Sequence, residues 1–180
     1  MIKLYSKVNT KASMKTLLSL VLATFMLASI GCGEGGTKQA TAKVEDAKKL
    51  NFTYKTTSGE IVDARSFYGK VVIVDIWDTW CGPCRKGIPH FIDLYDQYKG
   101  QVEVVGLAFA REGAPKVQAF SDQMKINYPI GIFGDEAAQI FGRPRSIPTC
   151  FIIGKDGEIS ETVVGYRPKE FFEQKIQGLL

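Results

Sequence analysis

Val71-Val-Ile-Val-Asp-Ile-Trp-Asp-Thr-Trp-Cys-Gly-Pro-Cys-Arg-Lys86 is the stretch of sequence that decides the fold. It begins with a nearly continuous apolar run, which is typical of a strand buried on both faces of a sheet. The cysteines Cys81 and Cys84 follow, and from there to about Lys99 apolar residues recur at helical spacing. The residues of this apolar face are Ile88, Phe91, Ile92, Tyr95 and Tyr98. The stretch therefore predicts a buried strand, a cysteine pair and an amphipathic helix, in that order.

Strand and helix patterns alternate on either side of this stretch. An N-terminal β-hairpin is predicted where two short alternating runs flank a Ser58-Gly59 turn. Asp135 is expected to cap a short helix that ends at Gly142. The other expected strands span 102–109, 128–133, 147–153 and 159–164. Two further helices are expected to begin at Pro115 and Pro168. This order predicts an α/β fold whose central mixed sheet, parallel in its first half and antiparallel in its second, carries helices on both faces.

The charge distribution leaves no basic stripe for nucleic acid. The chain has 180 residues, enough for one domain with a core, and carries 23 basic and 19 acidic residues. Four lysines lie in residues 1–31, which hold no acidic residue, so that from residue 32 onward the two signs balance. Nucleic-acid binding is therefore excluded as a function class, since it relies on clustered positive charge.

The N-terminal segment has the pattern of an export signal. A lysine-bearing stretch to Lys15 precedes an uncharged apolar run over 16–30, whose helical length of roughly 22 Å is too short to cross a membrane. Gly31-Cys32 follows at once and resembles a bacterial lipoprotein signal, in which the cysteine is lipidated and becomes the new N-terminus. Ser29 stands where such signals usually carry Leu. An uncleaved N-terminal anchor is the alternative.

We expect the chain to consist of three parts. They are a lipoprotein-type signal peptide over 1–31, a flexible tether over 32–49 and a folded domain over 50–180. The middle part is polar and rich in Gly, Lys and Glu, with no apolar period, as is usual for a flexible linker. The folded domain is therefore expected outside the cytoplasm, held at a membrane surface, which is the periplasmic face in a two-membrane bacterium.

Cys81 and Cys84 are the residues in which we expect the chemistry. Cys81 follows a buried strand where a helix begins, and the partial positive charge and unpaired N–H groups of a helix N-terminus favour a thiolate and lower its pKa. Such a thiolate attacks a partner's disulfide, and Cys84, one turn deeper, then resolves the mixed disulfide. Pro83 suits the first helical turn because its missing N–H would be unpaired there, and Gly82 keeps bulk away from the sulfurs.

Half a zinc site is the alternative interpretation of this motif. A structural zinc site needs four ligands, and the chain offers only Cys150 and His90 as further candidates. If Cys32 carries lipid, three cysteines remain, which is consistent with one pair and one free thiol. We therefore predict a redox pair, with no bound metal and no cofactor.

The segment from Val74 to Lys86 resembles the thioredoxin active-site segment. The wider pattern is similar to the TlpA/ResA branch of that superfamily: exported, membrane-tethered thiol–disulfide oxidoreductases, some of which serve cytochrome c maturation. The resemblance runs from about Asn51 to Leu180 and includes the N-terminal hairpin, an inserted strand–helix segment over 105–141 and the run Ser-Ile-Pro-Thr-Cys-Phe-Ile-Ile at 146–153. It implies a thioredoxin-like fold.

Pro148 is the second part of the expected site. A proline in a strand removes a ladder hydrogen bond and needs a reason. The resemblance implies a cis-proline packed beside the cysteines, with the backbone of Ile147 free to pair with a substrate strand; an ordinary edge proline is the alternative. Trp77 and Trp80 could both belong to the core, but Trp80, next to Cys81, is expected in the apolar contact surface, together with Gly82 and Pro83.

Asp75 interrupts the buried strand and is the third part. A buried carboxylate is costly unless paired or protonated, so its pKa should rise and make it a candidate proton acceptor for Cys84; a structural role is the alternative. Thioredoxins carry Asp at the matching place, whereas many TlpA/ResA-like proteins have a neutral residue there. Gly87 stands where the cytochrome-maturation branch commonly has Glu. Asp78 stands where Ala is usual, and either opposes the Cys81 thiolate or lies solvated in a loop.

Three further residue types remain open at this level. Cys150 is either an inert core thiol or a third thiol that communicates with Cys84. Arg143 and Arg145 either orient an acidic partner or are solvated loop charges, and His90 is expected on a helix surface.

We therefore expect an enzyme, a tethered thiol–disulfide oxidoreductase that reduces disulfides of exported proteins, with apocytochrome c among the possible partners. Since no cofactor motif is present, another protein must donate the electrons, and a membrane dithiol carrier is the expected donor. Copper handling and peroxide reduction are the alternatives. The first predicts copper binding that survives chelators, and the second predicts peroxide consumption that depends on Cys81.

Overall fold

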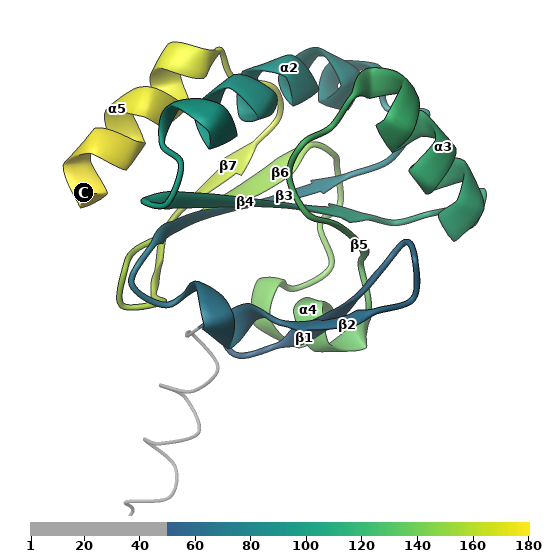
Figure 1. Cartoon of the computed structure of the whole chain (residues 1–180), viewed down its shortest axis with the longest axis horizontal. Helices are drawn as coiled ribbons and strands as arrows, with labels where there is room; N and C mark the ends of the chain where they lie inside the picture. The colour runs from purple at the N-terminus through teal and green to yellow at the C-terminus, as the bar shows by residue number, and fades with distance from the viewer. Residues whose placement is uncertain (1–49) are drawn as a thin grey trace, which may run out of the picture. The chain divides into compact units, whose positions relative to one another are not determined.

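Residues 50–180 are described by the computed structural model, and Figure 1 draws them in colour. The predicted signal peptide over 1–31, the lipid site at Cys32 and the tether over 32–49 lie outside the described residues and stay predictions. The described part is organised by one seven-stranded sheet in the order β2-β1-β5-β4-β3-β6-β7.

The sheet is mixed, as predicted. Its strands are β1 (Thr53–Thr56), β2 (Ile61–Asp63), β3 (Val71–Trp77), β4 (Val102–Ala108), β5 (Ile130–Ile132), β6 (Thr149–Ile153) and β7 (Ile159–Val164). The neighbouring pairs β3–β4 and β4–β5 are parallel, and every other neighbouring pair is antiparallel. The predicted N-terminal hairpin is β1–β2, and it extends the parallel half by pairing antiparallel with β5.

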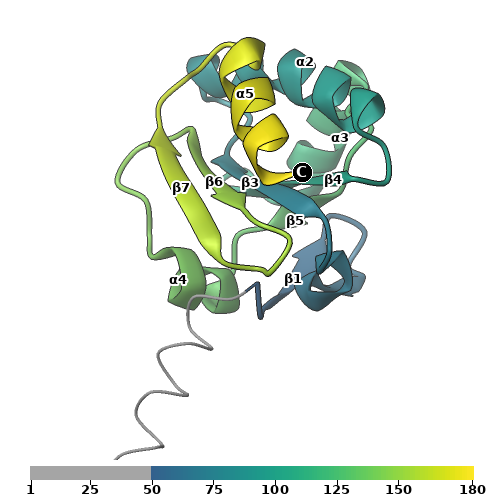
Figure 2. The same cartoon turned by 90° about the vertical axis from the view of Figure 1, so that its left-hand side faces the viewer.

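Helices cover both faces of the sheet, which confirms the predicted α/β layering (Figures 1 and 2). They are α2 (Gly82–Gln97), α3 (Ala114–Met124), α4 (Asp135–Phe141), α5 (Lys169–Leu179) and the short 3-10 helix η1 (Ala64–Phe67). Side chains of α2, α3 and α5 share one apolar cluster with the sheet, and those of α4 and η1 share the other. The sheet therefore separates two cores.

Strand β3 lies inside the sheet, between β4 and β6, and every one of its residues is buried. Successive side chains of a strand point to opposite faces. Ile73 and Trp77 accordingly join the core under α2, whereas Val72, Val74 and Ile76 join the core on the α4 side. The same alternation directs Asp75 to the α2 side, toward the cysteines.

Helix α2 is held to the sheet by one apolar stripe. Its buried residues are Cys84, Ile88, Phe91 and Leu94, which recur at helical spacing. Complete burial of an aliphatic side chain such as Ile88 contributes about 1.5–3 kcal/mol. Because Cys84 belongs to this stripe, the second cysteine points into the core rather than to solvent.

Several element boundaries differ from the prediction by one or two residues, and two of these differences concern a helix cap and a proline. Gly134, not Asp135, is the N-cap of α4, and Asp135 is its first residue and forms an ion pair with Arg143. The predicted strand 147–153 begins only at Thr149, because Pro148 has no N–H with which to join the ladder.

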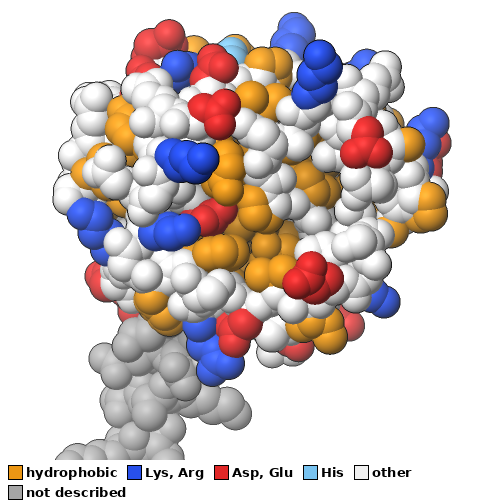
Figure 3. Space-filling model, in the orientation of Figure 1, with side chains coloured by type: hydrophobic (Ala, Val, Ile, Leu, Met, Phe, Trp, Pro, Cys, Tyr) orange, Lys and Arg blue, Asp and Glu red, His pale blue; other side chains and the backbone are white. Residues whose placement is uncertain are grey.

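The surface mixes charges of both signs. On the face seen in Figure 3, Lys and Arg side chains are interspersed with Asp and Glu around hydrophobic side chains near its centre. Among residues 50–180, no helix combines the length and the apolar character needed to cross a membrane.

Candidate active site

Cys81 and Cys84 form a disulfide at the start of α2, with an S–S distance of 2.06 Å and a Cα–Cα distance of 5.2 Å. Cys81 is the N-cap of the helix, and its Sγ accepts a hydrogen bond of 3.2 Å from the backbone N–H of Cys84. Cys81 therefore occupies the place where a helix N-terminus stabilises negative charge on sulfur. Both cysteines are almost fully buried in the disulfide form.

The rim above this disulfide is exposed. The side chain of Trp80 is 51% exposed, whereas Trp77, which ends β3, is buried in the core. Gly82 and Pro83 are exposed as well. The structure thus leaves an aromatic ring and a short stretch of backbone accessible next to Cys81, and their contact with a substrate stays a prediction.

Pro148 lies beside Cys84, and the peptide bond between Ile147 and Pro148 is cis. The carbonyl of Pro148 accepts a hydrogen bond from the N–H of Gly165, which ties this segment to the end of β7. Within residues 50–180, neither the N–H nor the C=O of Ile147 takes part in a backbone hydrogen bond. The backbone of Ile147 is therefore available to pair with another chain.

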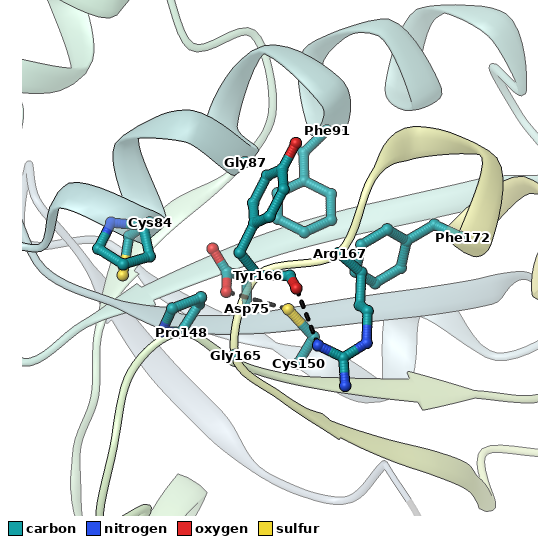
Figure 4. Close-up of a pocket in the computed structure, with 11 residues that line it drawn as sticks. Asp75, Cys84, Gly87, Phe91, Pro148, Cys150, Gly165, Tyr166, Arg167 and Phe172 are labelled. Atoms are coloured by element: carbon teal, nitrogen blue, oxygen red, sulfur yellow. Dashed lines mark hydrogen bonds between the residues drawn. The ribbon is translucent and has the colours of Figure 1, made fainter.

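Asp75 is buried and lies between Cys84 and Cys150 (Figure 4). Its Oδ1 accepts a hydrogen bond of 3.2 Å from the Sγ of Cys150, because the two residues are direct cross-strand neighbours on β3 and β6. Burial raises the pKa of Asp75 from 3.8 to about 7, and the Cys150 hydrogen bond opposes part of that rise. Burial, followed by the nearby Asp75 charge, raises the pKa of Cys150 well above its ordinary value.

A small cavity, with room for about one water molecule, brings these groups together. Asp75, Cys84, Gly87, Pro148 and Cys150 all line it. Among the described residues of its wall, Asp75 is the one carboxylate. Because Gly87 contributes no side chain, no second acid is present at that position of the wall.

The structure contradicts the expectation that Asp78 is a solvated loop residue. It is completely buried, and its carboxylate accepts hydrogen bonds from the N–H groups of Thr79 at 2.8 Å and Arg111 at 3.3 Å. Its backbone carbonyl accepts the N–H of Cys81 at 3.1 Å. Asp78 therefore ties the loop that carries Cys81 to the loop that follows β4.

The remaining candidates divide between site and periphery. Cys150 is a buried free thiol whose hydrogen-bond partner is Asp75, a contact that the sequence did not reveal because it depends on strand register.

His90 is half-buried rather than on an open surface, with its ring centroid 5.7 Å from that of Tyr166. Arg143 and Arg145 are exposed, and Arg143 pairs with Asp135 at 2.6 Å. No group of three or more His, Cys, Asp or Glu suited to a metal occurs in residues 50–180.

The sequence of this chain is similar to those of thiol–disulfide oxidoreductases. The AhpC/TSA family model matches residues 45–162. A thiol-disulfide oxidoreductase ResA of Bacillus cereus is 34% identical over 132 residues, which cover 72% of this chain and 75% of the relative.

Solved structures agree with this match. A thiol:disulfide interchange protein of the thioredoxin family from Chlorobium tepidum superimposes with a TM-score of 0.67 at 29% identity, covering 73% of this chain and 94% of that chain. StoA from Bacillus subtilis superimposes with a TM-score of 0.58 at 27% identity, covering 68% and 93%. The chain belongs to the thioredoxin-like AhpC/TSA family and is a thiol–disulfide oxidoreductase of the ResA type.

Proposed function

We propose that this oxidoreductase reduces disulfides of exported proteins outside the cytoplasm, through a cycle of the Cys81–Cys84 pair. The observation that carries the proposal is the position of Cys81. Its sulfur sits at the N-terminus of α2 and accepts the Cys84 N–H, and the preceding residue, Trp80, has an exposed side chain. A thiolate is favoured there, and a partner protein can approach it.

The first step is attack on the partner. The Cys81 thiolate forms a bond to one sulfur of the partner's disulfide, that disulfide breaks, and the second partner sulfur leaves as a thiolate and takes up a proton. Cys84 then loses its proton and attacks the Sγ of Cys81. The mixed disulfide breaks, so that the partner holds two thiols and the enzyme holds the Cys81–Cys84 disulfide. Two electrons have passed from the enzyme to the partner.

Asp75 is proposed as the acceptor of the Cys84 proton. It lines the same cavity as Cys84, and a pKa of about 7 lets it bind and release a proton near neutral pH. Cys150 donates a hydrogen bond to Asp75 and is proposed to hold its carboxylate in place. This hydrogen bond favours a role for Cys150 in positioning Asp75 over a role as a third redox thiol.

The partner is proposed to bind across Trp80 and the segment before β6. The free N–H and C=O of Ile147 would pair with an extended segment of the partner, as added strands do at open sheet edges. Pro148 packs beside Cys84 and closes the other side of the pair. Gly82 and Pro83 complete the exposed contact surface.

The proposed location rests on the sequence outside the described residues, and the electron supply is proposed from that location. An N-terminal lipid on Cys32 and a tether over 32–49 would hold the domain at a membrane surface. A membrane dithiol protein there would re-reduce the Cys81–Cys84 disulfide. Apocytochrome c is one candidate among exported proteins that carry a disulfide.

The reduction potential of the Cys81–Cys84 couple tests the reductase role. It is measured by equilibrium titration against a thiol–disulfide buffer, with Cys150→Ser as the control for the third thiol. A potential near that of thioredoxin, roughly −270 mV, supports the proposal. A potential near that of a strong oxidant, roughly −120 mV, overturns it and leaves a disulfide-forming role.

A further inference from the structure

A second hollow opens beside Trp80, and its lining is different from that of the Asp75 cavity. It holds about 550 Å³, part of it open to solvent, and three segments meet in it. These are the loop after β3, the loop after β4 and the segment before β6. They meet because β3 lies between β4 and β6, with Trp77 paired to Ala108 and Ile76 paired to Thr149.

We call this hollow the arginine groove and define it by Trp80, Phe109, Arg111, Arg145 and Ile147. It leads directly to the reacting sulfurs. Trp80 is bonded to Cys81 along the chain, and Ile147 is bonded to Pro148, which packs beside Cys84. Any extended segment that reaches Cys81 past Ile147 must therefore pass along or over this groove.

The floor of the arginine groove is apolar, but its walls carry two cations. The guanidinium carbon of Arg111 lies 4.9 Å from the ring centroid of Trp80, in the geometry of a cation–π contact. Arg145 is exposed on the opposite segment. Neither guanidinium forms an ion pair with a carboxylate of residues 50–180.

The nearby acids do not neutralise these two cations. The Asp78 carboxylate is buried and accepts two backbone N–H groups. Glu112 accepts a hydrogen bond from the hydroxyl of Thr79 at 3.2 Å and lines another hollow. Arg143, close in sequence to Arg145, is by contrast already paired with Asp135. The arginine groove therefore presents unpaired positive charge beside an apolar floor.

We infer that the arginine groove selects substrates in which an acidic side chain lies next to the disulfide-bonded cysteine. An extended segment of that kind would place apolar atoms on Trp80 and a carboxylate between Arg111 and Arg145. A guanidinium held against an indole keeps N–H donors free for a carboxylate, and complementary charge raises association rates and specificity. The inference rests on the proposed function for the nature of the partner, and it adds the chemical class of substrate.

The test uses three synthetic peptides that each contain one disulfide and differ only in the two residues that flank one cysteine: Glu, Gln or Lys. Second-order rate constants are measured with the whole protein at low ionic strength, both for reduction of the disulfide form and for oxidation of the dithiol form. Each rate is divided by the rate of the same peptide with dithiothreitol or with a small disulfide, which removes its intrinsic reactivity. We expect the Glu peptide to react about threefold to tenfold faster than the Gln peptide, and the Lys peptide to react more slowly.

One double variant carries both Arg111→Gln and Arg145→Gln. Its control is the single variant Arg143→Gln, which removes an arginine from the same segment as Arg145. The double variant should lose the Glu preference, whereas the control should keep it, and 0.5 M salt should reduce it in the wild type. Equal rates for Glu and Gln, or a preference that survives the double variant, would overturn the inference. If the reductase role is wrong, the peptides will instead be oxidised rather than reduced at equilibrium. The ratio of the rate constants for the Glu and Gln peptides still tests the charge preference in that case.

Discussion

Replacing Asp75 by Asn should stabilise the oxidised protein, and the gain should depend on pH. The side chain of Asp75 is almost completely buried, and its one side-chain hydrogen bond comes from Cys150. Its charged form is therefore poorly solvated. An Asn at this position fills the same space, can accept the same hydrogen bond and never carries a charge.

The size of the gain follows from the pKa. Burial raises the pKa of Asp75 from 3.8 to about 7, and each unit corresponds to about 1.36 kcal/mol. The folded protein keeps a proton that the unfolded chain releases between these values, so wild-type stability falls as pH rises through that window. Below about pH 4 both states are protonated and the cost vanishes. Above about pH 7 it is complete, at roughly 4 kcal/mol as an upper bound.

Urea unfolding from pH 4 to pH 8 measures this difference. The Cys81–Cys84 disulfide is kept oxidised throughout, so that neither cysteine titrates. Asp96→Asn, at an exposed position of α2, is the control and should show no such trend. The free energy of unfolding of Asp75→Asn minus that of the wild type should grow steadily up to about pH 7 and then level off. A difference that is constant with pH, or that shrinks as pH rises, would refute the reasoning.

Two stability predictions follow from close packing and from buried charge. Gly106→Ala should lower the free energy of unfolding by about 1–3 kcal/mol, since its Cβ would lie 2.7 Å from the Cδ1 of Ile130. Gly178→Ala, inside α5 and with open space around it, should not lower stability in the same urea assay. Lys70→Met should cost about 1–3 kcal/mol, because it removes the 2.8 Å ion pair of the buried Glu103. Adding Glu103→Gln should recover part of that loss in a double-mutant cycle; strict additivity would contradict it.

Much of the fold could be predicted because its signals are local. The apolar run of β3, the stripe of α2 and the turn residues of the hairpins each depend on neighbours in sequence. The cysteine pair at a helix start and the carboxylate on a buried strand were visible for the same reason. The structure places Asp75, Cys84 and Pro148 around one cavity, as that interpretation required.

The remainder of the site depends on register and on loops. The hydrogen bond between Cys150 and Asp75 exists because β6 pairs with β3 in one particular register, which no local pattern encodes. Burial of Asp78 requires the loop after β4 to bring the N–H of Arg111 to its carboxylate. A charged residue between a strand and a helix otherwise resembles a solvated loop residue, so no local pattern indicated its burial.

Trapping of the mixed disulfide tests the central claim most directly. Cys84→Ser and Cys81→Ser variants, each also carrying Cys150→Ser, are reduced, incubated with a disulfide-containing protein such as insulin, and analysed by intact-protein and peptide mass spectrometry. The account predicts that Cys84→Ser accumulates an adduct linked through Cys81, whereas Cys81→Ser forms little, because Cys84 belongs to the stripe of α2 that packs on the sheet, while Cys81 is the N-cap of the helix. An adduct that forms equally well through Cys84 would contradict the assignment of Cys81 as the attacking thiolate.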